Sequence, residues 1–403
     1  MELKHGAHLA YCTNIHRGES WPETFAALQS HTLAVRERVA PGRPFAIGLR
    51  LSAAAARELS DRPTLLAFQH WLAVNDCYVF TINGFPHGQF HGARVKSAVY
   101  TPDWTTAERL DYTNRLFDIL AELVPPGIAG SVSTLPGSFK AFIQRPEQLT
   151  AIRDNLWRCI DHIARVGSAS GRQLHLGLEP EPLCLLENTR ETVAFFADLR
   201  HDRPQDDRIN QHLGVNYDTC HLAVEFEEPR AAMGRLRDAG IKISKLHLSS
   251  ALKTIPTAAA RTALAAFADP VYLHQVVARD ADGQLAFYPD LPEALASAES
   301  AAEETLLASE WRIHFHVPLH APFIAPFAST SDHLLGTLNV LAESPNLCHH
   351  LEMETYTWEV LPAELKSRSV VDQLESEYAW TLARLAERGL ARIASPSSKL
   401  AKR

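Results

Sequence analysis

The sequence predicts an α/β protein built on a (β/α)8 TIM barrel, with a large insertion before the last strand and a helix at the C-terminal end. Apolar, strand-like runs alternate with helical periodicity over most of the 403 residues. About eight such units follow one another, which is the number that closes a parallel barrel. A doubly wound open sheet is the alternative, but no G-x-G-x-x-G motif follows an early strand to support it.

The first half of the chain contains five predicted strands with helices between them. The segment Ser20-Trp-Pro-Glu23 has the pattern of a capping box, so a helix is expected to begin here and to continue to about residue 39. The third strand leads into a glycine-rich loop that carries His87 and His91. The predicted strands cover residues 9–13, 45–51, 77–82, 127–134 and 173–178.

The second half completes the barrel after an interruption. Strands six and seven are predicted at 212–217 and 243–248, and the eighth only at 351–355. We interpret residues from about 250 to 330 as the insertion, with strand-like runs at 271–279 and 311–317. Prolines make a regular element at 318–326 improbable. A long helix at 363–389 follows, so that residues 1–394 are expected to form a single domain and 395–403 a polar tail.

The composition is that of a globular enzyme with a large core, because 46% of the residues are hydrophobic and 21% are charged. The formal net charge of −8 disfavours a nucleic-acid partner. Six scattered cysteines without a C-x-x-C motif are typical of reduced thiols. Neither a signal peptide nor a run of about 18 apolar residues is present, so we expect a cytoplasmic protein without membrane insertion.

Acidic and imidazole side chains follow several predicted strands, and such positions converge on one face of a parallel barrel. The strongest set takes one ligand from each of four strands. Carboxylates mixed with imidazoles suit Zn²⁺ or Mn²⁺, and also Mg²⁺ or Fe²⁺. The sequence therefore predicts a divalent metal bound by Glu179, Asp218, His247 and Glu354.

Each of these residues also has a structural explanation. Asp218, at the end of an apolar run, could cap the following helix, and Glu179 could do the same after its own strand. His247 could be a hydrogen-bonded core histidine. A cap, however, does not predict acidic or imidazole residues at three other strand ends, whereas a barrel metal site does. We therefore favour the metal site.

Further polar residues are candidates for additional roles. His314 and His316 alternate on one strand and thus share a face, which suits metal binding and a hydrogen-bonded pair equally. His349 and His350 precede the last strand at the wrong end of the barrel and are interpreted as structural. Cys220 is disfavoured as a nucleophile, because nothing in the sequence indicates a partner base.

These motifs jointly resemble the xylose-isomerase-like TIM-barrel superfamily, which includes sugar isomerases, ketose epimerases and zinc-dependent apurinic endonucleases. Leu178-Glu179-Pro resembles the strand-five motif of the isomerases. Three further motifs are similar to those of the endonuclease branch: Asp218-Thr-Cys-His221, His247-Leu-Ser-Ser and Met353-Glu354-Thr355. The resemblance extends over roughly residues 9–358.

A narrower resemblance is to the EboE-type metabolite traffic proteins, a family tied to the export of a prenylated or aromatic precursor. It is carried by residues 11–21, by Asn83-Gly-Phe-Pro-His87-Gly-Gln-Phe-His91 and by His314-Phe-His316-Val-Pro. This resemblance implies a possible link between the protein and metabolite export.

The superfamily resemblance also implies residue roles. Glu179, Asp218, His247 and Glu354 would bind the metal, and His221 with His314 and His316 is similar to the second metal cluster of the endonucleases, although that branch has Asp where this chain has His314. Either His87 or His91 could complete a third site. The catalytic lysine of the isomerases' Glu-Pro-Lys motif is replaced by Glu181, which argues against a simple xylose-isomerase mechanism.

The predicted function is metal-assisted isomerisation or proton transfer on a small sugar-like or polar metabolite. The metal would polarise an oxygen of the substrate while Glu179 or Glu354 moves a proton, with Glu181 and His221 as further candidates for the base. Two alternatives stay open. One is metal-dependent phosphodiester hydrolysis, as in the endonucleases, and the other is a non-catalytic protein that binds or carries a metabolite. The sequence predicts no particular oligomeric state.

Overall fold

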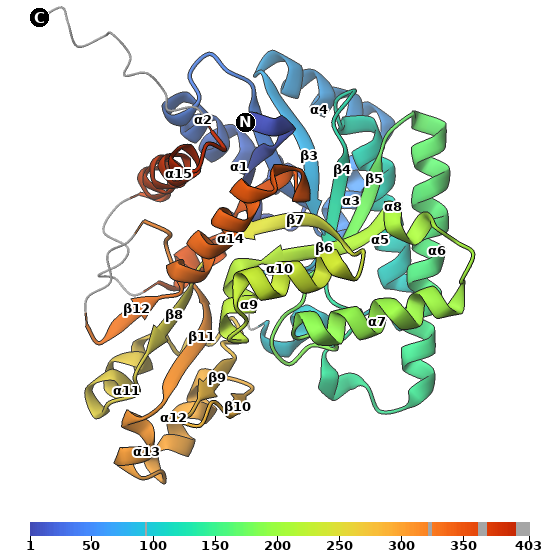
Figure 1. Cartoon of the computed structure of the whole chain (residues 1–403). Helices are drawn as coiled ribbons and strands as arrows, with labels where there is room; N and C mark the ends of the chain where they lie inside the picture. The colour runs from blue at the N-terminus through green and yellow to red at the C-terminus, as the bar shows by residue number, and fades with distance from the viewer. Residues whose placement is uncertain (93–94, 321–324, 362–368, 392–403) are drawn as a thin grey trace, which may run out of the picture.

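The computed structural model of the chain contains a closed barrel of eight parallel strands surrounded by helices (Figure 1). The predicted (β/α)8 barrel is therefore confirmed. Around the barrel the strands follow the order β1-β13-β7-β6-β5-β4-β3-β2, so the last strand closes it by pairing with the first and the seventh. The strands are β1 (His8–Cys12), β2 (Phe45–Arg50), β3 (Cys77–Asn83), β4 (Gly130–Thr134), β5 (Leu174–Leu178), β6 (Leu213–Asp218), β7 (Lys242–Leu248) and β13 (His350–Met353).

The structure describes residues 1–92, 95–320, 325–361 and 369–391. The predicted polar tail at 395–403 and the start of the predicted helix at 363–389 lie outside these residues. In the described part of the chain, no helix is both long and apolar enough to span a membrane.

The barrel strands are apolar because they are buried on both sides. All residues of β2, β4, β5, β6 and β13 are buried, as expected for parallel strands with helices outside and packed side chains inside. Gly48 on β2 leaves room for a polar group in this interior. A Cβ atom at that position would lie 1.8 Å from Oε1 of Glu352, so a glycine here makes space for a buried carboxylate.

The insertion forms a second, antiparallel sheet between β7 and β13, with the strand order β10-β9-β11-β8-β12. Figure 1 shows this sheet and its helices beside one end of the barrel. Two of its strands were predicted: β9 (Val276–Arg279) lies within the run at 271–279, and β11 (Glu310–His316) overlaps the run at 311–317. The other three were not predicted, because they are only three or four residues long: β8 (Ala251–Thr254), β10 (Leu285–Tyr288) and β12 (Phe327–Ser329).

The helices cover the outside of the barrel and of the second sheet. The predicted capping box is present: Ser20 Oγ accepts from the backbone N–H of Glu23, whose carboxylate accepts from the N–H of Ser20. The α-helices are α1 (Trp21–Ala27), α2 (Leu33–Val39), α3 (Ala53–Leu59), α4 (Arg62–Val74), α5 (Ala107–Leu123), α6 (Pro146–Ser170), α7 (Thr189–Asp202), α8 (Arg208–His212), α9 (Thr219–Val224), α10 (Pro229–Asp238), α11 (Ala258–Leu264), α12 (Leu291–Glu299), α13 (Glu303–Leu307), α14 (Ser331–Glu343) and α15 (Val370–Glu387).

A buried carboxyl group on helix α15 accepts a hydrogen bond from the loop after β13. Glu377 accepts hydrogen bonds from Thr355 Oγ1 at 3.0 Å and from the backbone N–H of Leu319 at 3.2 Å. Its other oxygen, Oε2, has no hydrogen-bond partner. Burial raises the pKa of Glu377 to about 7, and the hydrogen bonds from Thr355 and Leu319 oppose the rise only in part.

This raised pKa predicts a pH-dependent contribution to stability. Ionising Glu377 is harder in the folded chain, so the free energy of unfolding should fall as the pH rises from 4.5 to about 7. Glu377→Gln removes this fall. The free energy of unfolding of the variant, relative to the wild type, should rise by roughly 3 kcal/mol across the range. Urea unfolding below and above it measures the difference. Glu375→Gln, exposed on the same helix, is the control and should keep the fall that Glu377 causes.

Candidate metal centre

Four ligand side chains meet where β5, β6, β7 and β13 end. Glu179, Asp218, His247 and Glu354 each offer one atom, and these atoms all lie within 4.8 Å of one another. From His247 Nδ1 the distances are 3.1 Å to Glu179 Oε1, 3.4 Å to Asp218 Oδ2 and 3.1 Å to Glu354 Oε2. All four side chains are buried. The structure therefore brings together the four predicted metal ligands.

The imidazole of His247 is oriented from behind by a buried ion pair. Its Nε2 lies 3.1 Å from Glu352 Oε2, and Lys245 Nζ lies 2.6 Å from the same oxygen. The hydrogen bond from Nε2–H to Glu352 leaves Nδ1 as the atom that faces the three carboxylates. A carboxylate behind a histidine is the common arrangement that fixes a metal-binding imidazole.

The charges around His247 balance only in part. Burial disfavours the charged imidazole, but Glu354 and Glu179 outweigh burial and hold the pKa of His247 well above its usual range. Behind the ring, burial would raise the pKa of Glu352, yet Lys245 and His247 lower it to about 2. Without a further cation, a single imidazole faces three carboxylates.

Asp218 uses its two oxygens for different purposes. Oδ1 caps helix α9, because it accepts from the backbone N–H groups of Cys220 at 2.7 Å and His221 at 3.1 Å, and from Ser249 Oγ at 2.5 Å. Oδ2 points to His247 and has no hydrogen-bond partner. The two explanations considered for Asp218, helix cap and potential ligand, are therefore compatible.

Glu354 is held by two asparagines: Asn14 follows β1, the strand next to β13, and Asn83 ends β3. Asn14 Nδ2 donates to Oε1 at 2.6 Å, and Asn83 Nδ2 donates to the same oxygen at 3.2 Å. The other oxygen is left to face His247. Because both asparagines are buried, they fix the carboxylate without adding charge.

The unpartnered atoms of this cluster fit a cation. Glu179 Oε2 and Asp218 Oδ2 are buried and make no hydrogen bond. A buried carboxylate oxygen without a donor is costly, and a metal ion removes that cost. Three carboxylates and one imidazole form a hard, mixed oxygen and nitrogen set that suits Mg²⁺, Mn²⁺, Fe²⁺ or Zn²⁺.

Three histidines lie next to this cluster. The ring centre of His221 is 4.6 Å from that of His314 and 5.5 Å from that of His316. His221 also lies near the first cluster, with Nε2 3.9 Å from Asp218 Oδ2. Burial disfavours charge on His221, but Asp218 and Glu181 outweigh it and raise its pKa. Burial lowers the pKa of His314 and of His316, which disfavours the charged form of both rings.

Glu181 stands between the two clusters and the adjoining pocket. Its Oε1 accepts from the Tyr100 hydroxyl at 2.6 Å and from Gln275 Nε2 at 3.3 Å. Burial raises the pKa of Glu181 to about 7, and the nearby His221 offsets part of that rise. A carboxyl group with this pKa can either donate or accept a proton near neutral pH.

His87 and His91 lie outside these clusters. His91 Nε2 is 2.6 Å from the backbone oxygen of Asn14, and Nδ1 pairs with the Tyr272 hydroxyl. His87 packs edge-on against Tyr112 and is 3.6 Å from a carboxylate oxygen of Glu108. Neither histidine belongs to a group of described side chains whose ligand atoms lie within 4.8 Å of one another. The structure therefore does not bring them to the predicted ligands.

A pocket leads from the molecular surface to both clusters. The empty space along it, including space open to solvent, is about 540 Å³. Its inner end contains Glu179, Glu181, His221 and Glu354. Apolar and aromatic side chains form most of the remaining wall: Phe85, Pro86, Phe90, Val95, Val99, Tyr100, Tyr272, Leu273 and Tyr356.

Several residues that shape the centre were not predicted as functional. Lys245 looks like a core position of β7, and Asn14 and Asn83 are neutral residues far apart in the sequence. Only their positions at the ends of strands could have identified the two asparagines as site residues, because Asn14 follows β1 and Asn83 ends β3. Glu352 lies on β13 two residues before Glu354, and its sequence position alone does not assign it to the site.

Comparisons with known proteins support the fold. No protein-family model matches the chain, and no curated protein matches its sequence. Among solved structures, a xylose isomerase-like TIM-barrel protein from Mycobacterium smegmatis in complex with magnesium has a TM-score of 0.53 and 14% identity, covering 96% of this chain and 99% of its own. An L-ribulose 3-epimerase has a TM-score of 0.51 and 12% identity, covering 96% of both chains.

A third similar structure is a xylose isomerase domain protein from Planctomyces limnophilus, with a TM-score of 0.51 and 13% identity over 94% of this chain and 98% of its own. At these identities the likeness concerns the fold. The chain thus has the xylose isomerase-like TIM-barrel fold that the motifs predicted. The narrower resemblance to metabolite traffic proteins stays a prediction.

The contact between Glu352 and His247 predicts an effect on metal affinity. Glu352→Gln keeps the size of the side chain but removes the charge that orients the imidazole. Binding of Mn²⁺ or Zn²⁺, measured by isothermal titration, should weaken by about 10- to 100-fold. Glu343→Gln on the exposed face of α14 is the control. Equal affinity in a correctly folded Glu352 variant would contradict the orienting role.

Proposed function

We propose that this chain is a divalent-metal-dependent enzyme that isomerises a small sugar-like or polar metabolite by proton transfer. The observation that carries the proposal is the cluster of Glu179, Asp218, His247 and Glu354 at the inner end of a pocket, with two unpartnered carboxylate oxygens. The similar magnesium-bound barrel and the similar L-ribulose 3-epimerase agree with it.

The bound metal would polarise a carbonyl or hydroxyl oxygen of the substrate and so acidify the neighbouring C–H bond. Glu179 and Glu354 both line the pocket, so that either carboxylate can take a proton from a substrate bound there. Asn14 and Asn83 hold Glu354 in place, and His247 is held by Glu352. The reacting groups are therefore fixed before the substrate binds.

Glu181 is suited to return a proton to the product. It lines the pocket, and its pKa of about 7 allows both protonation states near neutral pH. The Tyr100 hydroxyl donates to it and fixes the orientation of the carboxyl group. This division of roles between carboxylates explains why the lysine of the simpler isomerase motif can be replaced here by Glu181.

Metal content tests the proposed ligand set. We expect Asp218→Ala and His247→Ala to lose the metal of the first cluster, because each removes one of four ligands from a buried site. Elemental analysis of the purified, dialysed proteins measures this loss. Glu225→Ala, another buried acidic residue, is a control and should keep the metal. Full metal content in both ligand variants would contradict the proposal.

Proton transfer is tested by isotope exchange. The metal-loaded protein is incubated with ketopentoses and ketohexoses in D2O, and NMR follows the exchange of substrate C–H for C–D. Glu181→Gln should slow turnover by about 10²- to 10⁴-fold while the metal is retained. An unchanged rate in this variant would exclude Glu181 as the acid or base.

Phosphodiester hydrolysis is the second candidate function, favoured by the three histidines beside the first cluster. Cleavage of bis(p-nitrophenyl) phosphate without any C–H exchange would support it. The net charge of −8 disfavours a nucleic-acid substrate. A non-catalytic role in metabolite binding or export predicts that neither reaction occurs. A cytoplasmic location belongs to all three proposals.

A further inference from the structure

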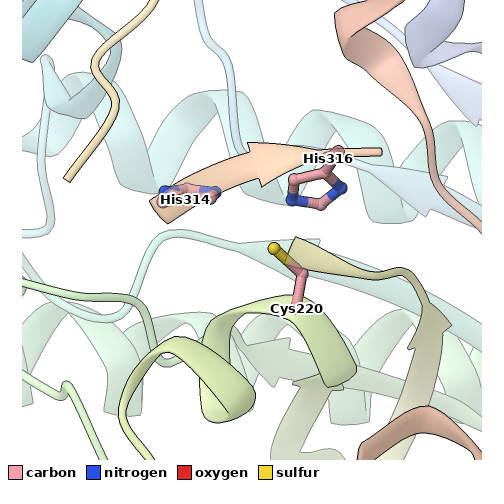
Figure 2. A group of neighbouring side chains, drawn as sticks. All are labelled: Cys220, His314 and His316. Atoms are coloured by element: carbon pink, nitrogen blue, oxygen red, sulfur yellow. The ribbon is translucent and has the colours of Figure 1, made fainter. Parts of the chain in front are cut away.

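A second group of potential ligands differs chemically from the first, because it contains sulfur. Cys220 lies on α9, and His314 and His316 lie on β11 of the inserted sheet. Their ligand atoms are all within 4.8 Å of one another, and all three residues are buried. Figure 2 shows the sulfur of Cys220 directed toward the two imidazole rings on the strand.

The hydrogen bonds of the two histidines leave the same nitrogen available on each ring. His314 Nδ1 is 2.8 Å from Gln275 Oε1, and His316 Nδ1 is 3.1 Å from the backbone oxygen of Glu354. Both partners are acceptors, so each Nδ1 carries the hydrogen and each Nε2 presents a lone pair. Neither Nε2 has a hydrogen-bond partner, although both side chains are almost fully buried.

Unpartnered buried nitrogens of this kind are unusual in a folded protein. Fixing Nδ1–H on a carbonyl oxygen is also how proteins orient imidazoles whose Nε2 binds a metal. The alternative suggested by the sequence, a hydrogen-bonded histidine pair, would leave Nε2 of one ring bound to the other ring. The structure shows no such bond, since both Nε2 atoms lack a partner.

The sulfur is a more available third ligand than the nearby carboxylates. Asp218 Oδ2 faces His247 in the first cluster, and Glu181 Oε1 already accepts from Tyr100 and Gln275. The thiols of Cys77 and Cys348 donate to backbone oxygens, both at 3.3 Å. In the described part of the chain the thiol of Cys220 has no hydrogen bond, and its sulfur is left facing the imidazoles.

We propose that Cys220, His314 and His316 form a second metal site, with two nitrogen ligands and one sulfur ligand, that prefers Zn²⁺. Zinc accepts thiolate and imidazole ligands at a tetrahedral centre, whereas Mg²⁺ and Mn²⁺ prefer oxygen. On binding, the thiol proton leaves to solvent and the sulfur binds as the thiolate. The fourth position is open to water or to His221, whose ring lies beside both other imidazoles.

Cobalt spectroscopy tests this site without any assay of activity. The first cluster contains no sulfur, and in the described part of the chain Cys220 is the cysteine whose sulfur lies within 4.8 Å of other potential ligand atoms, so we expect a near-ultraviolet thiolate-to-Co²⁺ charge-transfer band from the second site. We expect the metal-free, full-length protein to develop this band when Co²⁺ is added. Cys220→Ser and Cys220→Ala should abolish it and weaken binding of the second ion at least about tenfold. Cys159→Ser, a buried cysteine on α6, is the control and should keep the band.

The outcomes separate this proposal from the proposed function. If the cobalt-loaded protein shows only the weaker d–d absorption bands of oxygen and nitrogen ligands, the second site is overturned. The proposal for the first cluster is unaffected by that result. A charge-transfer band that survives both Cys220 variants would also overturn it. X-ray absorption of the zinc-loaded protein provides an independent check, since one sulfur neighbour should be seen in the wild type and none in Cys220→Ala. Loss of all metal in the wild type would contradict both proposals.

Discussion

The structure depends on how negative charge is accommodated at the end of the barrel. Three carboxylates converge on His247, and a fourth, Glu352, lies behind its ring. Lys245, itself buried inside the barrel, compensates Glu352. Such a pair rarely stabilises a protein as much as apolar packing does, so its presence indicates another purpose. Here that purpose is the orientation of His247, which directs Nδ1 to the remaining carboxylates.

This arrangement explains the local sequence around the site. Gly48 is required because any side chain would meet Glu352, and Ser249 is required because it donates to the capping oxygen of Asp218. The turn between β6 and α9 therefore satisfies one oxygen of Asp218 completely and leaves the other free to bind a cation. A carboxylate fixed on one side in this way loses little conformational entropy when a metal binds on the other.

Most of the barrel and the convergence of the four residues of the first cluster could be predicted from the sequence, because both follow from strand periodicity. A buried parallel strand is a short apolar run, and its end is marked by the first polar residue, as at Asp218 and Glu179. The supporting residues could not be predicted, since Lys245, Asn14 and Asn83 act through contacts between strands that are far apart in the sequence. The short strands of the inserted sheet were missed for a related reason, because three or four residues show too little alternation to define a strand.

The inserted sheet does more than extend the barrel. It contributes His314, Gln275 and Tyr272, which adjoin Glu181 and the pocket wall, and β11 ends with His316 bound to the backbone of Glu354. A strand of the insertion is thus hydrogen-bonded to the residue that supplies a ligand of the first cluster. The insertion therefore supplies part of the pocket wall and contacts the backbone beside the first cluster, and the barrel alone would form an incomplete pocket.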